Sequence, residues 1–167
     1  MFTKRFLIVA SALAFAIPIA ARAQSQSKLE EQWERLAGSD ANAKSLITGL
    51  RDGKEVTLTS GTTTTTFTPP TGKMGNGSVS NALLLAQESL KQQNITNPTA
   101  DQLKSALTGV LDQRASRKGW GEIANSMGVK LGDLRRNEDR AERAERAEKP
   151  ERPERPERPE RAARGGR

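Results

Sequence analysis

The sequence contains no cysteine and no histidine, and only two of its 167 residues are tryptophan. Without cysteine the chain cannot form disulfides, nor can it carry the lipid that bacterial lipoproteins attach to a cysteine. The usual zinc, copper and haem ligand sets are missing as well. Catalysis by Ser-His-Asp or Cys-His groups is excluded for the same reason. Because an enzyme would have to rely on Asp, Glu, Lys and Ser alone, we expect a non-enzymatic protein without a cofactor.

The first 23 residues have the order of a signal peptide. Lys4 and Arg5 form a positive start, residues 7–20 are an apolar run, and Ala21-Arg22-Ala23 is an A-x-A cleavage sequence. The run has fourteen residues, which is short of the roughly twenty that a membrane-spanning helix needs. We therefore predict a periplasmic or secreted protein, cleaved after Ala23 and without a membrane span in its mature form.

Charge is distributed unevenly along the mature chain. Residues 24–134 contain twelve basic and eleven acidic side chains, whereas residues 135–167 contain twelve basic and nine acidic ones. The second segment is a low-complexity tail of Ala-Glu-Arg and Ala-Glu-Lys triplets followed by four Pro-Glu-Arg triplets. The alanine triplets favour a helix that ends at Pro150, and the proline triplets favour polyproline II or disorder. We predict either a non-interacting spacer or a weak binder of anionic polymers.

Residues 24–134 predict one small, mainly α-helical domain with a single β-hairpin. Apolar side chains recur at helical spacing, and Trp33 on the first such face is expected to anchor the core. The expected helices span residues 27–37, 40–50, 79–93 and 99–117. Their candidate capping residues are Ser27 for the first helix, Ser39 or Asp40 for the second, and Thr99 for the last.

The hairpin is expected at residues 55–67, where a strand with period-two alternation precedes a run of five threonines. Ser60-Gly61 fits a two-residue loop between its strands. Because a lone hairpin is only marginally stable, we expect helices to pack against it.

Three glycines, Gly72, Gly75 and Gly77, surround Lys73 directly before the third helix. This composition invites comparison with a phosphate-binding loop, but the order G-x-x-x-x-G-K-[ST] is absent. We therefore attribute the glycines to the backbone freedom that the start of the next helix requires.

The stretch from Lys118 to Gly132 joins the longest amphipathic helix to a short second helix. In it, Trp120, Ile123 and Met127 form one apolar face, which we expect to pack on the stripe of residues 103–111. On that prediction Trp120 is a core residue. Its other possible role is contact with a partner.

The letters G-W-G-E-I-A-N-S-M-G-V in this stretch resemble the helix-turn-helix of bacterial sigma-factor and resolvase-type DNA-binding domains. The resemblance implies a recognition helix that begins at Lys130 and carries Arg135 and Arg136. Export and the near-neutral charge of residues 24–134 disfavour nucleic-acid binding, because that binding depends on neutralising phosphates.

Three motifs together resemble a group of small exported proteobacterial proteins. They are F-T-P-P-T-G-K-M-G from Phe67, N-I-T-N-P-T from Asn94 with the Gln-Leu pair at 102–103, and G-W-G-E-I-A from Gly119. The resemblance covers about residues 35–134 and leaves the tail outside. It implies export and a shared small fold, but it implies no reaction.

We therefore expect an exported structural or interaction module whose partner is an anionic envelope polymer or another envelope protein. No small-molecule substrate is evident. Two alternatives stay open, a helix-turn-helix nucleic-acid-binding protein and a hydrolase built on carboxylates. The candidate contact residues are Lys118, Trp120, Arg152, Arg155, Arg158 and Arg161.

Overall fold

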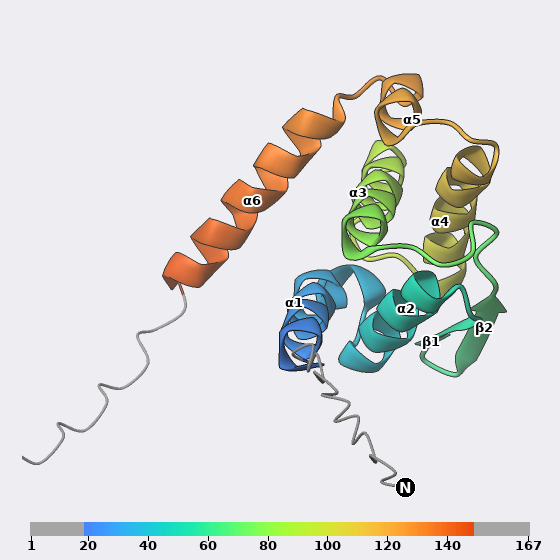
Figure 1. The fold of residues 1–167 in the computed structure, drawn as a ribbon, viewed down its shortest axis with the longest axis vertical. Coiled ribbons are helices and arrows are strands. Elements are labelled where there is room, and N and C mark those ends of the chain that lie inside the picture. The colour runs from blue at the N-terminus through green and yellow to red at the C-terminus, as the bar shows by residue number, and fades with distance from the viewer. Residues whose placement is uncertain (1–18, 149–167) are drawn as a thin grey trace, which may run out of the picture.

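The computed structural model describes residues 19–148 (Figure 1). Most of the predicted signal peptide precedes this range, and the Pro-Glu-Arg triplets follow it. The tail candidates Arg152, Arg155, Arg158 and Arg161 therefore lie outside the described residues.

Six helices and one two-stranded antiparallel hairpin make up residues 19–148. In chain order they are α1 (Ile19–Ala37), α2 (Asp40–Asp52), β1 (Val56–Ser60), β2 (Thr63–Phe67), α3 (Asn76–Gln92), α4 (Ala100–Ala115), α5 (Trp120–Ser126) and α6 (Leu131–Glu148). The expected mainly helical fold with a single hairpin is confirmed.

Two of the three predicted helix caps are confirmed. Ser39 Oγ accepts the Asn42 amide at 3.2 Å at the start of α2, and Thr99 forms a reciprocal capping box with Gln102 at the start of α4. The third prediction is wrong, because α1 begins at Ile19 and Ser27 lies inside it. The residues before Ser27 include several alanines, the strongest helix formers, so nothing stops the helix from extending. The predicted cleavage site after Ala23 consequently falls within α1.

The hairpin has its loop one residue later than predicted. Ser60 pairs with Thr63, so the two loop residues are Gly61 and Thr62. Gly61 has a φ of 60°, and a turn that needs positive φ at its first central position places glycine there. Helices pack against the hairpin as expected: the Thr65 hydroxyl on β2 donates to Asp101 on α4 at 2.6 Å.

The core is organised around α3, in which every residue from Asn81 to Ala86 is buried. One face of α3 joins a large cluster with α1, α2, α4 and the hairpin. Leu85 joins a smaller cluster with Val110, Ile123 and Ala124. The helix α3 therefore connects the two halves of the core.

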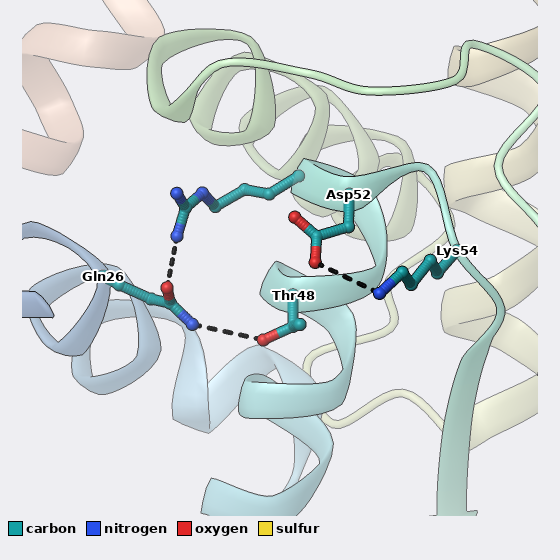
Figure 2. A network of polar contacts seen from close by, with 5 residues as sticks. Gln26, Thr48, Asp52 and Lys54 are labelled. Carbon is teal, nitrogen blue, oxygen red and sulfur yellow. Dashed lines mark hydrogen bonds and ion pairs between the residues drawn. The ribbon is translucent and has the colours of Figure 1, made fainter. Parts of the chain in front are cut away.

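Helices α1 and α2 are also joined by polar contacts (Figure 2). Gln26 donates to the Thr48 hydroxyl at 3.2 Å and accepts a hydrogen bond from Arg51. Lys54, just after α2, pairs with Asp52 at 3.8 Å. Because Gln26 follows the predicted cleavage site, the mature chain would keep the contacts between the two helices.

The last helix, α6, runs without a break from the expected domain, residues 24–134, into the charged segment that begins at residue 135. Leu131 and Leu134 pack against the smaller cluster. The Arg135 guanidinium then donates to the Asn81 side chain on α3 at 3.1 and 2.6 Å. Asn81 is only 5% exposed, and a buried polar group left without a partner costs about 1–3 kcal/mol. The start of the charged segment is thus part of the packed structure.

Candidate functional site

The motifs F-T-P-P-T-G-K-M-G and G-W-G-E-I-A are far apart in the sequence, but residues of both line one surface depression of about 540 Å³. Pro70, Lys73 and Gly75 come from the loop before α3, whereas Trp120 begins α5. The end of α4 lies between them because α3 and α4 pack together. The complete lining comprises Pro70, Thr71, Lys73, Met74, Gly75, Ser78, Arg114, Ala115, Arg117 and Trp120.

The charge of this lining has one sign. Among residues 19–148, its charged members are Lys73, Arg114 and Arg117, and that part of the chain adds no carboxylate to the lining. We call this surface the basic depression. The near balance of charge over residues 24–134 conceals it, because the compensating acidic side chains lie elsewhere. A concave surface of one charge sign attracts ligands of the opposite sign.

Trp120 forms a wall of the basic depression and is also a packing residue. Its side chain is half-buried and packs against both core clusters. The Arg114 guanidinium lies over the indole ring, 5.0 Å from its centroid, which is a cation–π geometry. The expected face of α5 is confirmed for Ile123, which is fully buried, whereas Trp120 and Met127 are only partly buried.

The predicted contact residue Lys118 does not line the basic depression. Its ammonium contacts the Gln113 side chain at 3.4 Å. Its backbone oxygen accepts a hydrogen bond of 2.8 Å from Arg114. Lys118 therefore helps to orient Arg114, and the cation that faces the depression comes from Arg114 itself.

Arg117 occupies a backbone position where glycine is usual. The amides of Arg117 and Lys118 bond to the carbonyls of Arg114 and Gln113, the pattern of a Schellman helix end. Its φ is 68°, and this left-handed conformation costs a residue with a side chain roughly 1–2 kcal/mol. The strained position places a charged side chain at the edge of the basic depression, and such strain is often found at functional sites.

The start of α3 opens into the same depression. No side chain caps this helix at Gly75, whose φ is −75°. A Cβ atom added at Gly75 or Gly77 would meet nothing within 4 Å. The predicted need for backbone freedom is confirmed only at Gly72, where φ is 67°. The other two glycines place no side chain over the start of the helix, where the Ser78 and Val79 amides already bond to the Gly75 carbonyl.

Thr71 adds a further polar group to the lining. Its Oγ1 atom is buried and has no hydrogen-bond partner. Buried hydroxyls in folded proteins nearly always have such a partner. This oxygen is itself inaccessible, so the groups that an anion can reach are the three cations and the start of α3.

Two other depressions have linings of a different kind. One, between α1, α3 and α6, mixes acidic and basic side chains, among them Glu31, Glu138, Arg35 and Lys91. The other, along α3 and α4, is lined mostly by serine and glutamine, and Asp101 is its charged member. Within residues 19–148 no cluster of acidic side chains is arranged to hold a metal ion. The same residues include no helix with the length and hydropathy that a membrane crossing requires.

The helices that resemble a helix-turn-helix are α5 and α6, joined through Gly128. The two basic residues at the start of α6 have partners within the protein. Arg135 donates to buried Asn81, and Arg136 forms an ion pair with Asp133. These contacts commit Arg135 to the packing of α6 on α3, whereas the ion pair of Arg136 lies on the surface with its side chain 71% exposed.

Comparisons of this chain with protein-family models, curated proteins and solved structures found no match. The fold and the site therefore define the protein only as a class: a small helical protein with a basic depression built from three chain segments. Sequence reasoning singled out Trp120, rejected a phosphate-loop interpretation of the glycines around Lys73, and missed Arg114 and Arg117. The sequence did contain a clue to Arg117. The chain continues Arg-Lys-Gly shortly after α4, and a helix end commonly requires a residue in the left-handed conformation there.

Proposed function

We propose that this protein is an exported, non-enzymatic interaction module that holds an anionic partner of the bacterial envelope. The observation that carries the proposal is the basic depression, to whose lining the described residues contribute three cationic side chains and no carboxylate. Export rests on the signal-peptide order of residues 1–23. Envelope polymers are rich in phosphate, sulfate and carboxylate groups, and arginine is well suited to bind each of them.

The basic depression and the tail are two separate sources of positive charge. The tail interleaves arginine with glutamate, so its field is largely cancelled over the Debye length of about 10 Å at 0.1 M salt. The depression has no such compensation among its lining residues. We therefore place the main contact on the folded part and a weaker, more salt-sensitive one on the tail.

Retention of the full mature chain on heparin, across a salt gradient, tests this assignment. We expect the double variant Lys73→Gln/Arg117→Gly to elute at clearly lower salt than wild type. The slope of log affinity against log salt should fall by about one unit for each cation removed. Replacing the four tail arginines by glutamine should have the smaller effect.

The matched control is Asn94→Gly. Asn94 has a φ of 60° at the end of α3, so this variant makes the same backbone change as Arg117→Gly without removing a charge. Neither change should destabilise the fold, because glycine adopts positive φ without strain. Unchanged retention of the double variant, with a large loss in the tail variant, would move the binding surface to the tail.

Export has its own test. N-terminal sequencing of the protein from envelope fractions of a native host should begin at Gln24, as the A-x-A sequence predicts. An intact Met1 on a cytoplasmic pool would contradict export and would favour the nucleic-acid-binding alternative.

A further inference from the structure

The basic depression offers more hydrogen-bond donors than a carboxylate can accept. Its cations are two guanidinium groups and one ammonium group, from Arg114, Arg117 and Lys73. The Ser78 and Val79 amides bond to the Gly75 carbonyl, so the further donors at the start of α3 are the amides of Asn76 and Gly77. A carboxylate has two oxygens, whereas a phosphate monoester has three terminal oxygens and up to two negative charges.

The local backbone also favours a phosphate. Gly75 lines the depression, and a side chain there would occupy open space directly beside the start of α3. Phosphates bind helix starts because the amides point at the ligand and the helix dipole favours negative charge. Here the helix has 17 residues, and Lys73, Arg114 and Arg117 line the same depression as its N-cap residue Gly75.

The size and the walls of the depression indicate what carries the phosphate. About 540 Å³ exceeds the volume of a phosphate several-fold and falls in the range of pockets for small molecules, about 300–1,000 Å³. Pro70, Met74 and Trp120 supply apolar surface beside the cations. A ring with one apolar face, such as a sugar, fits this combination of charge and apolar wall.

We propose that the basic depression recognises a phosphate monoester carried on a sugar. The inference rests on the proposed function and names the chemistry of the anionic partner. The phosphate sits at the start of α3 between Lys73 and Arg117, with Arg114 held over Trp120 to complete the contact. The sugar packs against the apolar wall. A sugar phosphate of this kind is present both in free metabolites and in the headgroup of lipid A.

Isothermal titration of the full mature chain with two sugar acids of similar size tests the inference. Glucose 1-phosphate should bind at least tenfold more tightly than glucuronate, which presents a carboxylate instead. Vesicles with and without lipid A then distinguish the two sources. Binding to lipid A vesicles alone assigns a lipid headgroup, and binding to glucose 1-phosphate assigns a free or polymer-borne sugar phosphate.

The variant Gly75→Ser separates this inference from the proposed function. Serine at this position caps the helix with its own side chain, so it occupies the amides that a phosphate needs and leaves the fold intact. It changes no charge. We expect at least a tenfold loss of glucose 1-phosphate affinity, unchanged retention on heparin and a melting temperature at or slightly above that of wild type.

Each outcome has a definite meaning. Measurable binding of the two sugar acids with equal affinity, or full glucose 1-phosphate affinity in Gly75→Ser, overturns the phosphate inference, as does the absence of binding to both glucose 1-phosphate and lipid A vesicles. If heparin retention still depends on Lys73 and Arg117, the proposed function survives that result. If heparin retention is also independent of both residues, the basic depression is no anion site and both proposals fail.

Discussion

Replacing Trp33 by alanine is expected to lower the free energy of unfolding by about 3–5 kcal/mol, the usual cost of truncating a buried aromatic. Trp33 is 1% exposed and belongs to the large core cluster. Its indole is among the largest fully buried side chains of residues 19–148. Since α1 packs extensively on α2, this truncation loosens the attachment of the whole first helix. Urea unfolding followed by circular dichroism measures the change.

The control is Trp33→Phe, which keeps most of the ring. The Trp33 Nε1 atom is buried and lacks a hydrogen-bond partner, and an unpaired buried donor costs about 1–3 kcal/mol. Phenylalanine removes this donor, which offsets part of the lost packing, so we expect a net loss of at most about 2 kcal/mol. A loss as large as that of the alanine variant would mean that the indole N–H has a partner in solution. A loss near zero for Trp33→Ala would contradict the packing of α1.

Replacing Gly53 by alanine is expected to destabilise the protein by about 2–4 kcal/mol and to weaken anion binding at the same time. Gly53 ends α2 with a φ of 65°. A Cβ atom there would lie 2.7 Å from the Gly72 carbonyl carbon and 2.8 Å from the Lys73 nitrogen. Both contacts are with backbone, which cannot rotate away as a side chain can. The loop that carries Lys73 must therefore shift, and its Met74 amide bond to the Arg51 carbonyl shifts with it.

The matched control is Gly38→Ala at the end of α1. Gly38 has a φ of 82°, yet a Cβ atom there meets nothing within 4 Å. This variant isolates the cost of the backbone conformation, about 1–2 kcal/mol, from the cost of the close approach. Chemical denaturation gives the stabilities, and retention on heparin reports on the loop. Equal stability losses in the two variants would show that the contact between Gly53 and the loop is relaxed in solution.

Much of the secondary structure was predictable from local patterns. The caps at Ser39 and Thr99 and the apolar stripe of α4 depend on contacts within one or two helical turns, which lie close in sequence. The errors arose where several local patterns were acceptable. Ser27 begins a sequence that matches a capping box, but the alanines before it continue the helix. The hairpin loop lies one residue later than predicted, which places Gly61 at the first central position of the turn.

By itself the sequence determined the fold class, the core position of Trp33 and the absence of the chemistry that needs cysteine or histidine. It did not predict the basic depression, because net charge is a sum over residues and carries no information about where they lie. Lys73 and Arg114 are about forty residues apart in the chain, and they share a surface only because α3 packs against α4. The same packing left Trp120 half-buried beside Arg114 instead of sealing it in the core. Periodicity assigns a side chain to a face of its own helix, whereas what covers that face depends on segments distant in the sequence.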